Sequence, residues 1–153
     1  MQFRATNRWV GGGLNQSSIK DFYAACGEDT TRTTPFVLDA DEPAIMAGGD
    51  SVPNPVEFVL HALISCLTTS AVYHAAVAGI EIEAIESELA GDMDARGLFG
   101  LSDDVHKGYD NVQVIMRVKT DATAETIRGL ALYSPVFEMI SGSLPVDLTV
   151  EKL

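Results

Sequence analysis

Cys66 is the residue of this chain with the clearest chemical potential, because it lies in the middle of a long apolar stretch. At about 100° per residue, a helix over this stretch places the hydroxyl groups of Thr69, Ser70 and Tyr73 on the side of the thiol. Such donors polarise a thiolate, so the arrangement suits a nucleophile in an apolar pocket. A free cysteine in an apolar stretch is also typical of core packing. The spacing alone leaves both interpretations open.

The other residues with reactive side chains are weaker candidates. Cys26 lies in the loop-like segment CGEDT, and we interpret it as a bystander. His61 and His74 fall on other sides of the predicted helix from Cys66, which favours packed or hydrogen-bonded histidines over catalytic bases. Two cysteines are too few for a disulfide framework or a structural zinc site. We therefore expect free thiols and no metal.

The stretch from Asn54 to Ile80 predicts one long helix around Cys66. Pro55 suits the first helical position, and Gly79 suits a C-terminal stop. Glu57 is its one formal charge in about seven turns, so the helix has no face suited to water. At about 1.5 Å per residue the helix measures roughly 36 Å, more than a subunit of this size can cover. We expect a partner chain to complete its burial.

The composition indicates one domain over residues 1–153 and excludes several kinds of partner. The length fits a single domain, and 46% hydrophobic residues is a globular level. A formal net charge of −12 argues against nucleic acid and against anionic membrane surfaces. Glu57, His61 and His74 would be costly inside a membrane, so we expect no membrane span. The first residues, MQFRATNRW, show no targeting pattern, which favours a cytoplasmic protein.

The remaining segments predict strands and two shorter helices. Alternating apolar residues and turn signals predict strands over residues 2–10, 33–39, 80–94, 109–120 and 145–152. Residues 18–25 predict either a strand or a helical turn, and residues 26–30, 40–53 and 96–108 predict loops. A helix begins at Asp121 or Thr123, and Ser134 and Pro135 suit the N-cap and first position of another. This order indicates an α+β layer structure.

The pattern N-P-x-E-x-x-L-x-A-L-x-x-C-L-T-T, which runs from Asn54 to Thr69, resembles the central motif of the OsmC/Ohr family of thiol peroxidases. Four further segments support the resemblance in the same order along the chain: FVLDADEP (36–43), YHAAVAGI (73–80), GDMDARG (91–97) and SPVF (134–137). Together these segments extend over nearly the whole chain.

The resemblance implies an OsmC-like α+β fold in which two subunits intertwine as a homodimer. Each subunit contributes a long buried helix between mixed or antiparallel sheets built partly from both chains. Cys66 stands at the position of the peroxidatic cysteine, near the dimer interface, and would reduce organic hydroperoxides or hydrogen peroxide through a sulfenic acid. The resemblance implies no metal and no organic cofactor. Thr69, Ser70, Tyr73 and Ser134 are the expected pocket residues.

Two positions depart from the family pattern. Ser134 stands where the resolving cysteine falls, so an external thiol or dithiol must reduce the sulfenic acid. Hydroperoxide-resistance members carry a glutamate directly after the Asn-Pro pair, where this chain has Val56. Glu57 follows one residue later, about 180° and roughly 13.5 Å from Cys66 along an unbroken helix. Glu57 either serves an opposite pocket or stabilises the first helical turn.

The family arginine that supports the thiolate comes from the early strands, where this chain offers Arg4, Arg8 and Arg32. Arg8 is the candidate that we choose, which makes Cys66, Arg8 and Glu57 the predicted catalytic set. The departures from the family pattern also keep a second hypothesis open. In that hypothesis the chain is a homodimeric binding or structural member of the family that has lost the redox cycle.

Overall fold

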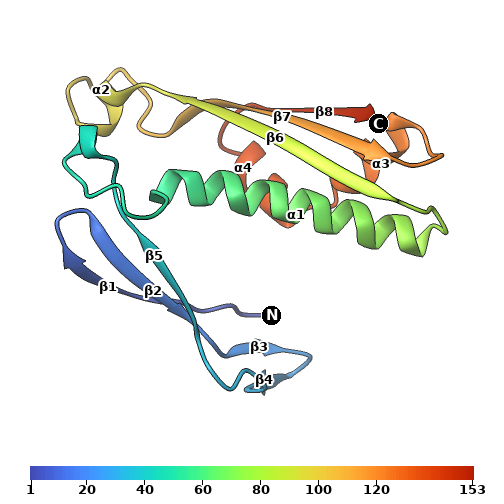
Figure 1. Ribbon diagram of the computed structural model, residues 1–153, viewed down its shortest axis with the longest axis horizontal. Helices are drawn as coiled ribbons and strands as arrows, with labels where there is room; N and C mark the ends of the chain where they lie inside the picture. The colour runs from blue at the N-terminus through green and yellow to red at the C-terminus, as the bar shows by residue number, and fades with distance from the viewer. The chain divides into compact units, whose positions relative to one another are not determined.

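The computed structural model describes all residues from Met1 to Leu153, and the chain divides into two compact units. The first unit comprises Met1–Phe58 and the second Val59–Leu153. Figure 1 traces the elements of both units along the chain. The expectation of a single domain over residues 1–153 stays a prediction.

A three-stranded antiparallel sheet forms the centre of the first unit, with the order β1-β2-β5. A separate antiparallel hairpin, β3–β4, and a 3₁₀ turn, η1, complete the unit. The bounds are β1 Thr6–Gly11, β2 Leu14–Ile19, β3 Phe22–Ala24, β4 Gly27–Asp29, β5 Phe36–Ala40 and η1 Ala44–Met46.

Two features of the first unit differ from the sequence-based expectation. The second strand begins at Leu14, although we expected a strand or helical turn from residue 18. Residues 27–29, expected in a loop, form β4. The β3–β4 connection is a two-residue turn in which Ala25 and Cys26 both have positive φ, 49° and 64°. This is the geometry of a type I′ turn, which brings antiparallel strands together with the correct twist.

The long connection after β5 is organised by one carboxylate. Asp41 is 3% exposed and accepts hydrogen bonds from the backbone N–H groups of Glu42, Gly49 and Ser51 and from the Ser51 hydroxyl. Burial raises the pKa of Asp41, but these hydrogen bonds together outweigh it and leave the pKa below its ordinary value. Gly48 lies so close that an added Cβ would come 1.8 Å from the Glu42 carbonyl oxygen. The predicted loop is therefore a tightly bonded segment that leads into the long helix.

A mixed three-stranded sheet, ordered β6-β7-β8, forms the second unit together with its helices. Strands β6 and β7 are antiparallel, and β7 and β8 are parallel. The bounds are α1 Pro55–Val77, β6 Ala84–Met93, α2 Ala95–Leu98, β7 Tyr109–Lys119, α3 Ala124–Ala131, α4 Pro135–Ser141 and β8 Val146–Lys152. The first turn of α1 belongs to the first unit. The α+β class is as expected, whereas β6 starts four residues later than predicted and α2 lies in a predicted loop.

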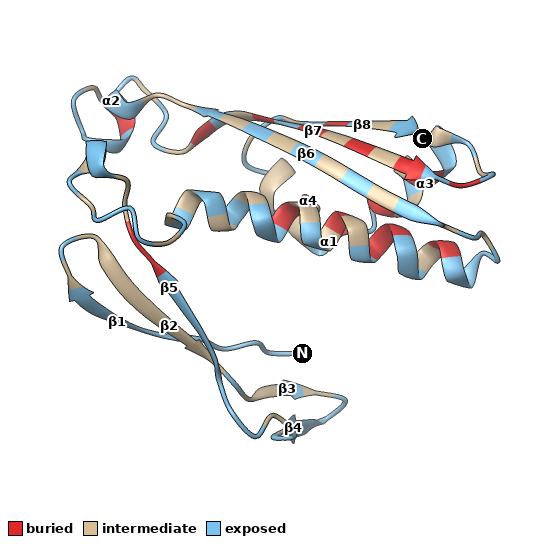
Figure 2. Cartoon of the chain, in the orientation of Figure 1, coloured by how far each residue is buried: buried red, intermediate tan, exposed pale blue.

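The core of the second unit lies between one face of this sheet and its helices. Figure 1 shows α1 running along the sheet, and Figure 2 shows buried residues along β7 and along one stripe of α1. Alternate residues of β7 are almost completely buried, among them Val112, Val114, Met116 and Val118. On the outer face, Arg117 pairs with acidic residues of both neighbouring strands. This is the alternation of a sheet with one wet face.

The long helix α1 buries only one stripe within the chain. The buried residues are Leu63, Leu67, Ser70, Ala71 and Ala75. By length and composition α1 would also qualify as a membrane span, although core helices of soluble proteins pass the same criterion. We had expected Glu57, His61 and His74 to exclude a membrane span, but the composition of α1 alone does not exclude one.

Candidate functional site

Helix α1 places Cys66 at the edge of its buried stripe. The thiol is partly buried, one position before the fully buried Leu67. Thr69 and Tyr73, which share its side at helical spacing, are exposed, and the Tyr73 side chain is 69% exposed. Cys66 therefore lies where the core of the second unit ends and an open apolar face begins.

The hydroxyl groups expected around the thiol are used in different ways. Thr69 Oγ1 donates to the Ser65 carbonyl at 2.9 Å, a bond within the helix backbone. Ser70 belongs to the buried stripe and faces the core. No hydrogen bond joins the Cys66 thiol to any residue of this single chain. Tyr73 is thus the hydroxyl residue on the open side whose position best suits contact with a ligand.

Ser134 acts as a helix cap. It is 1% exposed, and its Oγ accepts from the Phe137 N–H at 3.1 Å, with Pro135 at the start of α4. The predicted N-cap is confirmed. The hydroxyl therefore stabilises the start of α4, and a serine at this position cannot form a disulfide.

Glu57 forms a capping box with Asn54 at the start of α1. The Asn54 N–H donates to Glu57 Oε2 at 2.8 Å, and the Glu57 N–H donates to Asn54 Oδ1 at 2.9 Å. Two backbone donors that a helix leaves unpaired are satisfied by this exchange. The carboxylate therefore has a structural task, as one of the two predicted interpretations required. Its participation in chemistry stays a prediction.

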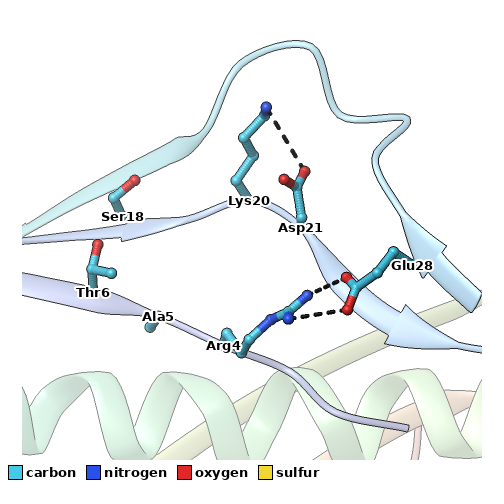
Figure 3. Close-up of a pocket in the computed structure, with 7 residues that line it drawn as sticks. All are labelled: Arg4, Ala5, Thr6, Ser18, Lys20, Asp21 and Glu28. Carbon is cyan, nitrogen blue, oxygen red and sulfur yellow. Dashed lines mark hydrogen bonds and ion pairs between the residues drawn. The ribbon is translucent and has the colours of Figure 1, made fainter.

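The three early arginines have different partners, all within the first unit. Arg4 forms a two-pronged ion pair with Glu28. Figure 3 shows this pair on the wall of a cavity of about 370 Å³. Lys20 Nζ lies 3.8 Å from the Asp21 carboxylate beside it, so the charges that line the cavity are paired with one another. Arg4 is consequently neutralised in place.

Arg32 and Arg8, the other two early arginines, have different kinds of partner. Arg32 donates to the Lys20 carbonyl at 2.7 Å and lies over the rings of Phe22 and Phe36, 4.9 and 5.2 Å from their centroids. Arg8 donates from Nε and Nη2 to Gln16 Oε1, at 3.2 and 2.8 Å. Arg8 is thus the one of the three that is in contact with neither a carboxylate nor an aromatic ring. The sequence could not identify Gln16 as its partner, because that requires the register of β1 against β2.

The remaining candidates take no part in a charged cluster. His74 stacks on Tyr133 with ring centroids 4.2 Å apart, as expected of a packed histidine, whereas His61 is exposed. Cys26 is exposed in its turn. No group of three or more His, Cys, Asp or Glu side chains is arranged to hold a metal ion.

Comparisons with known proteins agree on the fold. The chain matches the family model described as OsmC-like protein over residues 48–149. It is similar to the crystal structure of an OsmC like protein from Mycoplasma pneumoniae, at 12% identity and a TM-score of 0.74, over 100% of this chain and 98% of that one. No curated protein matches it.

Two further solved structures carry more specific descriptions. One is an organic hydroperoxide resistance protein OsmC from Legionella pneumophila, at 17% identity and a TM-score of 0.63, over 99% of this chain and 97% of that one. The other is the organic hydroperoxide resistance protein OhrB of Bacillus subtilis, at 19% identity and a TM-score of 0.55, over 100% of this chain and 98% of that one. At these identities the likeness establishes the fold.

Proposed function

Because this chain belongs to the OsmC-like protein family, we propose that it is a thiol-dependent peroxidase that reduces organic hydroperoxides, or hydrogen peroxide, at Cys66. Two structures that share its fold are described as organic hydroperoxide resistance proteins. The observation that carries the proposal is the position of Cys66, a partly buried thiol in the centre of α1 beside the open side of the helix. A reactive cysteine must be accessible to its substrate, and reactive cysteines are typically partially exposed.

The chemistry requires one thiol and an external reductant. The Cys66 thiolate attacks one oxygen of the peroxide, the O–O bond breaks, and the other oxygen leaves as an alcohol or as water after taking up a proton. Cys66 is left as a sulfenic acid, oxidised by two electrons. An external thiol then forms a mixed disulfide with release of water, and a second thiol releases Cys66 as a disulfide forms between the reductant thiols. Ser134, which carries no sulfur, explains why the reductant is external.

Arg8 is the arginine that we assign to the thiolate. Arg4 is bound by Glu28 and Arg32 is held between aromatic rings, whereas the Arg8 guanidinium contacts only the neutral amide of Gln16. A guanidinium that is not already neutralised can stabilise a thiolate and the negative charge that develops on a peroxide oxygen.

A homodimer is the assembly that we propose, in the cytoplasm, where thiol reductants keep cysteines reduced. Strand β5 exposes Phe36, Val37 and Leu38 in succession, and it is an edge strand of its sheet. Tyr73 and Val77 are exposed on α1. Apolar surface of this extent is typical of a protein interface, and a second copy of the chain offers complementary surface of the same kind.

A second candidate function is a homodimeric binding protein without a redox cycle. Two hydrogen bonds favour the binding protein. The Thr69 hydroxyl bonds to the helix backbone and Glu57 bonds within the capping box, so neither group polarises the thiol. In that case Cys66 is a packing residue of the interface.

Intact-mass spectrometry distinguishes the two functions. In Cys26→Ser protein, where Cys66 is the only thiol, we expect stoichiometric cumene hydroperoxide to be consumed and a sulfenic acid to be trapped by dimedone. The Cys66→Ser variant is the matched control and should consume none. A wild-type thiol that stays unmodified under excess peroxide would contradict the peroxidase and support the binding protein.

A further inference from the structure

The cavity of the first unit that Figure 3 shows takes no part in the proposed function. We propose that it binds a small zwitterion of the class of a free α-amino acid, with the ligand's ammonium at Asp21 and its carboxylate at Lys20. Every residue that carries this proposal belongs to the first unit. The proposal does not depend on the chemistry of Cys66, so either one can fail without the other.

Two cations and two anions line this cavity, and only one of the two ion pairs is joined by hydrogen bonds. The Arg4 guanidinium donates from both terminal nitrogens to the Glu28 carboxylate. Lys20 Nζ lies 3.8 Å from Asp21 Oδ1, which is beyond hydrogen-bond distance. Because the four charges cancel, a ligand with a net charge of either sign meets repulsion as well as attraction. A dipolar ligand whose two ends face opposite charges is attracted at both.

The Lys20–Asp21 pair leaves polar atoms without hydrogen-bond partners. Asp21 Oδ1 is buried, yet no residue donates a hydrogen bond to it. The Lys20 ammonium carries three donors, and no acceptor of the chain lies within hydrogen-bond distance of it. The two side chains keep 43 and 36% of their surface exposed, so a small molecule can reach both. A ligand that brings one donor and one acceptor would satisfy a pair that does not satisfy itself.

The separation of these two charged groups matches the dimensions of an α-amino acid. Standard N–Cα and Cα–C bonds hold the ammonium nitrogen of such a molecule about 3 Å from its nearer carboxylate oxygen. An α-amino acid that lies antiparallel to the Lys20–Asp21 pair, 3.8 Å between its charged atoms, therefore places each of its ends beside the opposite charge. A lone amine or a lone carboxylate can meet only one of the two.

The other end of the cavity offers neutral hydrogen-bonding groups. Thr6 on β1 lies opposite Ser18 on β2, so their side chains share one face of the sheet. Neither hydroxyl is hydrogen-bonded to another residue of the chain, and Figure 3 shows both apart from the four charged side chains. The cavity volume of about 370 Å³ is near the lower limit for small-molecule sites, about 300 Å³. This size suits a single amino acid.

Nuclear magnetic resonance tests the proposal with L-alanine as the probe. In ¹⁵N-labelled protein we expect saturable shifts of the backbone amide signals of Lys20 and Asp21. Propionate and ethylamine each lack one of the two charges of L-alanine and should bind at least about tenfold more weakly. Asp21→Asn and Lys20→Met should each weaken the binding of L-alanine about tenfold, the lower end for a charged hydrogen bond, because both groups are partly exposed.

Lys119→Met is the matched control, because Lys119 forms an exposed ion pair with Glu83 in the second unit and does not line this cavity. It should bind L-alanine as the wild type does, and circular dichroism checks that each variant is folded. If propionate or ethylamine binds as tightly as L-alanine, or if Lys119→Met weakens binding as much as Lys20→Met, the cavity is not a zwitterion site. The absence of saturable shifts with L-alanine would also overturn the proposal. None of these outcomes bears on the reaction of Cys66 with peroxide.

Discussion

The two units of this chain differ in how much apolar surface they bury within one subunit. In the second unit, Val114, Met116 and Leu67 are each at most 1% exposed. In the first unit, β5 exposes Phe36, Val37 and Leu38 by 57, 53 and 42%. Figure 2 shows the contrast as red residues on β7 and pale blue along most of β5. The second unit has a layered core of its own, and the first is a sheet that lacks one.

This contrast indicates where the fold depends on assembly. A sheet needs a second layer against its apolar face, since isolated sheets do not bury enough surface to offset their loss of chain entropy. Sheet β6-β7-β8 finds that layer in the helices of its own unit. The apolar residues of β5 need cover from elsewhere, and we propose that a second copy of the chain supplies it.

The largest expected effect is on the core of the second unit. Leu67→Ala removes a fully buried side chain from α1 and should lower the free energy of unfolding by about 2–5 kcal/mol. Denaturant unfolding at two protein concentrations measures it. The loss should be similar at both concentrations, because the contacts removed lie within one chain. A loss that grows on dilution would mean that this core also depends on assembly.

Asp41 should have the next largest effect, and it acts within the first unit. The pKa of Asp41 is lowered, so its contribution to stability is complete above the pKa of the unfolded chain, about pH 4, and is lost as the pH falls through the lower folded pKa. Asp41→Asn should lower the denaturation midpoint at neutral pH and flatten its fall below about pH 4. Asp103→Asn, an exposed acid, is the control and should leave the profile unchanged. An unchanged acid limb in Asp41→Asn would contradict this role.

The difference in burial between the two units also explains which strands could be predicted from the sequence. The alternation of β7 has a physical cause within the chain, a wet face and a buried face, and its range was predicted within one residue. Strand β2, LNQSSI, has no such alternation and is half-buried throughout, so its start at Leu14 was missed. A strand without one buried and one exposed face carries a weak periodic signal.

In the candidate site, too, the sequence predicts the features that depend on local spacing and misses those that depend on rotamers or strand register. Helical spacing predicts Thr69 and Tyr73 on the side of Cys66, and α1 is continuous over these residues. It could not show that the Thr69 hydroxyl bonds to Ser65, which depends on a rotamer. The Arg8–Gln16 contact depends on strand register, which the sequence of one strand does not encode.

Leu38→Ala tests whether the exposed apolar residues of β5 in the first unit lie in an interface. The side chain is 42% exposed in one chain, so the cover that a partner adds should be worth about 1 kcal/mol. The loss of stability should grow on dilution if β5 lies in an interface. Thermal unfolding over a hundredfold range of concentration, together with light scattering, measures it. Equal losses of stability at every protein concentration would place Leu38 outside any interface.

The capping box at the start of α1 should give the smallest effect, and it separates structure from chemistry at Glu57. Asn54→Ala removes the acceptor for the Glu57 N–H and should lower stability by about 1 kcal/mol. Glu57→Gln keeps an oxygen for the Asn54 N–H, since glutamine also serves in capping boxes, and should leave stability nearly unchanged. Sulfenic acid formation at Cys66 then decides the second role. If Glu57→Gln reacts at the wild-type rate, the charge is not needed for the chemistry; a slower reaction in an equally stable protein would restore Glu57 to the catalytic set.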